Sequence, residues 1–186
     1  PSAAVVVATV RALKMHGGLA KDELSHEELA ALERGLPNLL RHVTNMKDVY
    51  GLPTVVAINR FPTDTEAELN LVRERCRELG VGAALSNVWA QGGTGGTELA
   101  EAVVKLCEEP GEFRFAYGLD GGIEDKLRAV VQRVYRGRDI DVLPEAAAQI
   151  DRLTALGMAH MPVCIAKTQY SFSDDKTKLG APEDFT

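Results

Sequence analysis

Three short apolar runs, each followed by polar residues and then by a helical pattern, constrain the fold of this chain most strongly. They cover residues 3–10, 54–59 and 83–86. Continuous apolar strands are typical of parallel sheets, which are covered on both faces, and the alternation with helices indicates βαβ units. We therefore expect an α/β fold with a mostly parallel, doubly wound sheet and flanking helices, followed by a smaller α/β segment.

Helical patterns follow the three runs and cover residues 27–49, 65–79 and 97–108. Ser25, with Glu28 three positions later, is typical of a capping box at the start of the first helix. Pro37 lies inside that helix and predicts a kink or a break. Thr63 and Asp64 have two interpretations. They can contribute to a ligand site, or they can serve only as the N-cap of the second predicted helix.

The remainder of the chain has a weaker pattern. Strands are expected over residues 113–117 and 162–166, with an extended piece over 141–143. Helices are expected over residues 123–135 and 144–156, before a polar loop over 167–186. We expect residues 1–110 to form a Rossmann-like domain and residues 111–186 to form a second α/β segment, which can be continuous with the first.

Composition excludes several classes of protein. The chain has 186 residues, 26% charged and 45% hydrophobic, with a net charge of −6. It has no long basic block, so we expect no nucleic-acid partner. No apolar run reaches the ~20 residues of a membrane helix. The sequence opens directly on a strand at Pro1 and ends at Thr186 without a stop signal, so we expect a piece of a longer protein.

Cysteine usage favours a reducing compartment. Cys76, Cys107 and Cys164 are scattered singly. Their odd number argues against a disulfide framework, and no metal-ligand spacing is present. We expect a cytoplasmic protein without a metal site in this chain, and we interpret the three cysteines as small buried hydrophobes.

A cluster of cations follows the first apolar run. Arg11, Lys14 and His16 precede Gly17-Gly18. Arginine can hold a carboxylate or phosphate through two hydrogen bonds, and lysine adds a point charge. These three residues are therefore candidates for catalysis or for binding a small anion. The alternative is a solvated basic turn.

Two aromatic residues follow the second and third runs. Phe61 stands before a proline in a loop, and Trp89 is the single tryptophan. Ligands of open α/β sheets bind beyond the carboxyl ends of the strands, so these rings can face each other across a crevice and clamp a flat heterocycle. A lone tryptophan is equally often a packing residue.

A glycine run and a polar segment are weaker candidates. Gly92, Gly93, Gly95 and Gly96 surround Thr94 before a predicted helix, where backbone amides can approach an anion. The run lacks the Lys-Ser/Thr ending of a P-loop and is not GxGxxG, so a flexible turn is an equal alternative. Lys167 opens a donor-rich segment and is a further candidate contact to an anion or nucleotide.

Four segments together resemble the formate–tetrahydrofolate ligase (formyltetrahydrofolate synthetase) family. Residues 7–18 read V-A-T-V-R-A-L-K-M-H-G-G, which is similar to one of that family's diagnostic patterns. The stretch at 53–68, Trp89 with its glycines, and residues 162–175 follow in the family's order. The resemblance covers essentially the whole chain.

The resemblance implies an ATP-dependent ligase that joins formate to tetrahydrofolate through formyl phosphate, giving 10-formyltetrahydrofolate, ADP and phosphate. It implies that the pterin ring lies between Phe61 and Trp89, with Leu85 and Val88 lining the same slot. ATP with Mg²⁺, a monovalent cation and a homotetrameric assembly are further features of the family.

Two departures accompany the resemblance. Relatives usually carry Lys and Glu where this chain has Gln91 and Thr94. The family's P-loop pattern is absent, so we expect the chain to be the middle-to-late part of the enzyme, able to bind folate but inactive alone. The alternatives are a non-catalytic truncated module kept for assembly or folate binding, and a generic nucleotide-binding domain.

Overall fold

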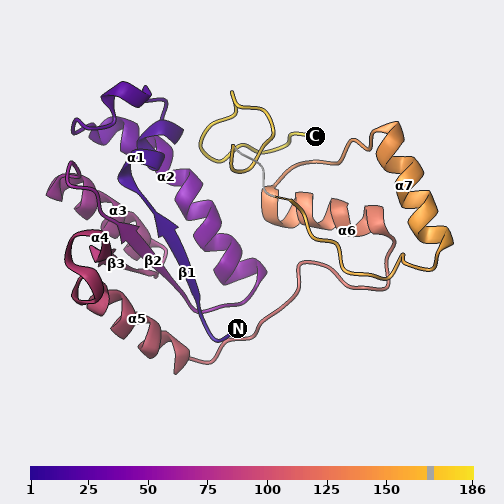
Figure 1. Ribbon diagram of the computed structural model, residues 1–186, viewed down its shortest axis with the longest axis horizontal. Helices are drawn as coiled ribbons and strands as arrows, with labels where there is room; N and C mark the ends of the chain where they lie inside the picture. Colours follow the sequence, from indigo (N-terminus) through magenta and orange to yellow (C-terminus); the bar gives the residue numbers. More distant parts are fainter. Residues whose placement is uncertain (167–169) are drawn as a thin grey trace. The chain divides into compact units, whose positions relative to one another are not determined.

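The computed structural model describes residues 1–166 and 170–186 (Figure 1). The chain divides into two compact units. The first contains Pro1–Phe113 and Leu179–Ala181, and the second contains Arg114–Lys178 and Pro182–Thr186.

A three-stranded parallel sheet forms the centre of the first unit. Its strands are β1 (Ala4–Ala8), β2 (Thr54–Asn59) and β3 (Gly82–Ser86), in the order β1-β2-β3. Val6 pairs with Val56, and Ala57 pairs with Ala84. The expected parallel α/β arrangement is confirmed.

Helices cover both faces of this sheet. They are α1 (Val10–His16), α2 (Leu29–Thr44), α3 (Glu66–Glu78), the short α4 (Val88–Gln91) and α5 (Thr97–Cys107), with 3-10 helices at Lys21–Glu23 and Gly92–Gly96 and a π-helical turn at Asn45–Val49. Figure 1 shows α2 and α5 on opposite sides of the strands. The main core lies on the α2 side, where Leu32, Leu36, Ile58, Leu69 and Val72 pack together.

The first strand is shorter and more exposed than expected. It ends at Ala8, because the Thr9 hydroxyl accepts a hydrogen bond from the Ala12 amide at 3.1 Å and so caps α1. Val5 and Val7 are 43% and 67% exposed. The prediction of a buried strand reaching Val10 was therefore wrong: α5 packs on β2 and β3 and leaves one face of the edge strand β1 uncovered.

Tertiary contacts replace the expected signals at α2. The capping box between Ser25 and Glu28 does not form, since the Glu28 amide donates instead to Glu68 Oε1 at 3.2 Å. The helix also runs through Pro37 without a break. Pro37 itself is exposed, while Leu36 and Leu39 on the packed face are buried, so core packing holds the helix together.

The α3 helix begins with a capping box of its own. The Thr65 hydroxyl accepts from the Glu68 amide at 3.3 Å, and Glu68 Oε2 accepts from the Thr65 amide at 3.1 Å. The N-cap is Thr65, so the prediction that Thr63 or Asp64 caps this helix was wrong by one residue. The Asp64 side chain is therefore available for another role.

The second unit contains α6 (Ile123–Val130), a π-helical turn (Val131–Tyr135) and α7 (Pro144–Ala155). Strands were predicted over 113–117 and 162–166, with an extended piece over 141–143, and in the described part of the chain none of them is a strand. The Tyr117 hydroxyl donates to the Val163 carbonyl at 2.6 Å and accepts from the Val163 amide at 2.9 Å. A side chain thus satisfies the backbone groups that a strand partner would otherwise bind.

The cysteines divide between core and surface. Cys76 is fully buried on α3, where burial raises the pKa of its thiol to about 11. Cys107 and Cys164 are exposed, so the prediction that all three are buried was wrong for these two. Among the described residues, no helix combines the length and apolar character needed to cross a bilayer.

Candidate functional site

The candidate site lies beyond the carboxyl ends of the three strands. The register aligns Ala8 with Ile58 and Asn59 with Ser86, so the loops after the strands meet at one edge of the sheet. The Arg60 amide donates to the Ser86 carbonyl at 3.1 Å and ties the second loop to the third strand. This is the edge at which open parallel sheets bind ligands.

A cavity of about 300 Å³ opens among these loops. It is lined by Asn59, Arg60, Phe61, Pro62 and Trp89. The sequence therefore predicted correctly that Phe61 and Trp89 share one crevice. Trp89 is 83% exposed, so its indole has most of its apolar surface available for a ligand.

Phe61 is held on its backbone and on its ring. Its amide donates to Asp64 Oδ2 at 2.8 Å, and its carbonyl accepts from the Asp64 amide at 3.0 Å. The Arg11 guanidinium lies 5.3 Å from the ring centroid, within the range of a cation–π interaction. No sequence signal indicated that α1 contacts the second loop, because 50 residues separate Arg11 from Phe61.

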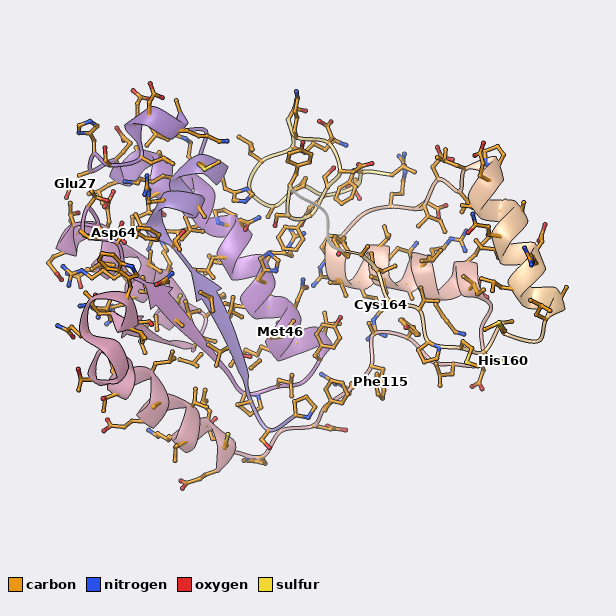
Figure 2. The ribbon with its side chains drawn as sticks, viewed as in Figure 1. Glu27, Met46, Asp64, Phe115, His160 and Cys164 are labelled. Atoms are coloured by element: carbon orange, nitrogen blue, oxygen red, sulfur yellow. The ribbon has the colours of Figure 1, made fainter. Side chains whose placement is uncertain are left out.

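Asp64 is a functional candidate for which the sequence favoured a helix cap over a role at a ligand site. It is 5% exposed, and burial raises the pKa of its carboxyl, opposed by the hydrogen bond from the Phe61 amide. Its second oxygen, Oδ1, is buried without a hydrogen-bond partner among the described residues. Figure 2 shows Asp64 among the loops beyond the strand ends.

Lys14 does not face the cavity; it is completely buried. Its Nζ lies 2.8 Å from Glu68 Oε1 and donates to the His26 carbonyl at 2.7 Å. Burial favours the protonated form of Glu68, but hydrogen bonds from Lys14, Thr65 and Glu28 outweigh it and lower the pKa of that carboxyl. The basic cluster of the sequence thus separates, with Arg11 at the site and Lys14 in an ion pair between α1 and α3.

His16 accepts a hydrogen bond from the Gly180 amide at 3.3 Å through Nδ1, and Asn38 donates to the Gly180 carbonyl at 2.7 Å. Burial lowers the pKa of His16, and burial together with the charges of His16 and Arg41 lowers the pKa of His42. These contacts give His16 a place in the packing of the first unit.

Mild acid should destabilise the protein through these two histidines. A lowered pKa in the folded state means that their neutral forms contribute stability above pH ~6.5, and that this contribution is lost as the pH falls toward the folded-state values. We expect the melting temperature to fall between pH 7.5 and 5.5, and to fall less in His42→Gln. Exposed His160→Gln is the control and should retain the wild-type pH dependence; an equal loss in His42→Gln would contradict this assignment.

The glycine run supports the loop that carries Trp89. The Asn87 amide donates to the Gly95 carbonyl at 2.9 Å, and a Cβ on Gly95 would lie 2.4 Å from the Asn87 carbonyl oxygen. Thr94 donates from its hydroxyl to the Gln91 carbonyl at 2.8 Å. The two positions at which this chain departs from the resemblance therefore bond to each other, within the tryptophan loop.

Substituting Gly95 should disturb this loop. In Gly95→Ala the new methyl group would overlap the Asn87 backbone, which can move only with the segment that contains Trp89. We expect a change in Trp89 emission and a destabilisation of about 1–3 kcal/mol, measured by urea unfolding. Gly93→Ala is the matched control, because nothing lies within 4 Å of a Cβ there. Identical emission and stability in both variants would contradict the close contact.

The other sequence candidates are not among the residues that line the cavity. Leu85 is partly buried and packs against the main core, and Val88 is 47% exposed on α4. Gly92, Gly93 and Gly96 form the 3-10 segment before α5. Lys167 lies outside the described residues. Among the residues that are described, no three or more His, Cys, Asp and Glu side chains gather in a group that could hold a metal ion.

The fold and the site define a parallel α/β protein with an aromatic crevice at the carboxyl edge of its sheet. A comparison with protein-family models matches residues 1–186 to the family described as formate–tetrahydrofolate ligase. The chain therefore belongs to the formate–tetrahydrofolate ligase family, a family of ATP-dependent ligases of folate and one-carbon metabolism that use formate, tetrahydrofolate and ATP.

Proposed function

We propose that this chain carries the pterin-binding part of a formate–tetrahydrofolate ligase, with the pterin ring stacked between Phe61 and Trp89. The observation that carries the proposal is the cavity of about 300 Å³ whose lining includes both rings. Family membership supplies the ligand, since tetrahydrofolate is the flat heterocyclic substrate of these ligases.

The lining suits such a ring. Two aromatic residues offer stacking faces, and Asn59 and Arg60 add polar groups at the same cavity. Ligand pockets of this kind combine apolar walls with a few polar groups that fix orientation. Arg60 already pairs with Glu66 at 3.1 Å, so we assign orientation of the ring's polar edge to the Asn59 amide.

In this proposal the residues bind and orient the folate so that its N10 faces the activated formyl group. Burying the ring between Phe61 and Trp89 fixes its plane and excludes water from both of its faces. ATP supplies the phosphoryl group that activates formate in this family. The described residues of this chain are assigned only to the folate side of the reaction.

Removing either wall should weaken folate binding. Phe61→Ala and Trp89→Ala should each raise the dissociation constant for tetrahydrofolate at least about tenfold, because each variant loses a stacking face and its buried area. Isothermal titration calorimetry under anaerobic, reducing conditions measures this. Phe115→Ala is the matched control; Phe115 is 75% exposed and belongs to the second unit (Figure 2).

Wild-type affinity in Phe61→Ala or in Trp89→Ala would overturn the proposed slot. Equal weakening in Phe115→Ala would also count against it, since the effect would then not depend on the cavity.

A further inference from the structure

Phe61 and Trp89 are supported very differently. Phe61 has its amide, its carbonyl and its ring in contact with other residues, through Asp64 and Arg11. The Trp89 side chain makes no hydrogen bond or ring contact with any residue of the described chain and is 83% exposed. One wall of the cavity is therefore fixed before a ligand arrives, while the other is free to adjust.

Asp64 fixes the backbone of Phe61. Its carboxylate accepts a hydrogen bond from the Phe61 amide, and its own amide donates to the Phe61 carbonyl. One residue therefore binds both backbone polar groups of Phe61. Its carboxyl is buried, and burial disfavours the ionised form and raises its pKa. A buried carboxylate with one unsatisfied oxygen costs stability, which is typical of a residue retained for function.

Arg11 fixes the ring. It is the second residue of α1, a helix whose start is set by the Thr9 cap, and its guanidinium lies over the Phe61 ring with 5.3 Å between Cζ and the centroid. A flat ligand cannot stack on the ring face that the guanidinium occupies. Phe61 also lines the cavity that it shares with Trp89, so a ligand in that cavity has only the other ring face on which to stack.

We propose that Arg11 and Asp64 are positioning residues that hold Phe61 as a preorganised wall, with Arg11 covering one ring face so that the pterin stacks only on the other. This inference rests on the proposed function. It assigns Arg11 a role through Phe61 and not through an anionic substrate. Preorganisation raises affinity because the ordering cost of the Phe61 loop is met before binding.

Arg11→Met keeps the length of the side chain but removes the charge and the planar group, and Arg11→Lys restores the charge alone. We expect Arg11→Met to weaken tetrahydrofolate binding about two- to thirtyfold and Arg11→Lys to recover part of the loss. The quenching of Trp89 at saturation should stay at the wild-type level in both, because the complex itself is unchanged once formed.

For Asp64, Asp64→Asn keeps an acceptor for the Phe61 amide and Asp64→Ala removes it. We expect Asp64→Asn to bind tetrahydrofolate nearly as wild type does and Asp64→Ala to bind about tenfold more weakly. Arg11→Met alone decides the matter if Asp64→Ala does not fold, since Arg11 is only partly buried.

The outcomes separate the two proposals. Binding that is lost in Phe61→Ala but unchanged in Arg11→Met would overturn the positioning role and leave the folate slot intact. Binding that is unchanged in Phe61→Ala, or absent in the wild-type protein, would overturn the slot and the inference together. Loss of affinity in Arg11→Met with an unchanged urea midpoint, and partial recovery in Arg11→Lys, is the result that supports the inference.

Discussion

Replacing Lys14 with methionine should destabilise the protein by about 3–5 kcal/mol, the largest loss that we expect from a single substitution. Lys14 Nζ and Glu68 Oε1 are 2.8 Å apart, and both side chains are almost completely buried. Methionine fills much the same space but leaves the Glu68 carboxylate buried without its cation. Urea unfolding at pH 7 measures the loss.

Two further variants test this explanation. Lys14→Met combined with Glu68→Met removes both charges and should recover part of the stability, because an apolar pair avoids the desolvation of two ions. The recovery is incomplete, because the Glu28 and Thr65 amides lose their acceptor on Glu68. The control is Arg75→Met, which breaks exposed ion pairs with Glu33 and Glu78 and should cost no more than ~1 kcal/mol. A loss in Lys14→Met as small as that in Arg75→Met would contradict the buried pair.

The second large effect concerns the close contact between α1 and α2. A Cβ on Gly35 would lie 1.8 Å from the Leu13 carbonyl oxygen, and one on Gly17 would lie 1.8 Å from the Ala31 carbonyl oxygen. Both clashes are with backbone, so no side-chain rotation can relieve them. Gly35→Ala should therefore destabilise the protein by about 3 kcal/mol, even though alanine favours a helix over glycine by about 1 kcal/mol.

The matched control for Gly35→Ala is Ala30→Ser on the exposed side of the same helix. It should change the free energy of unfolding by no more than about 0.5 kcal/mol. A stabilising Gly35→Ala would show that helix propensity outweighs the clash and that the two helices are less closely packed than described.

The parallel sheet and most of the helices of the first unit were predictable, because they follow from local signals. The apolar run at Thr54–Asn59 became β2 with the predicted bounds, and α3 began and ended within one residue of expectation. In such segments the apolar residues follow a single pattern, continuous in a buried strand and helical in a helix. The neighbouring residues therefore suffice to predict the type of element and its bounds.

The features that failed depend on partners distant in sequence. Tyr117 takes the hydrogen bonds of Val163 that were expected to join strands, and Glu68 takes the Glu28 amide that Ser25 was expected to help cap. A sequence pattern gives the donors and acceptors but not which of them meet across 40 or more residues.

The candidate site was predictable only in part for the same reason. The positions of Phe61 and Trp89 after successive strands predicted a shared crevice, since parallel strands bring the loops that follow them to one edge of the sheet. The burial of Lys14 and the contact of Arg11 with Phe61 could not be predicted. The sequence around a basic residue is the same whether its side chain contacts a ligand, a carboxylate or an aromatic ring.

The most direct test of the folate slot is a titration of the protein with tetrahydrofolate while the emission of Trp89, the only tryptophan of the sequence, is recorded under anaerobic, reducing conditions. We predict saturable quenching in the wild-type protein that is lost or shifted at least about tenfold in Phe61→Ala. Emission that falls without saturation, or a binding curve that is identical in Phe61→Ala, would contradict the account.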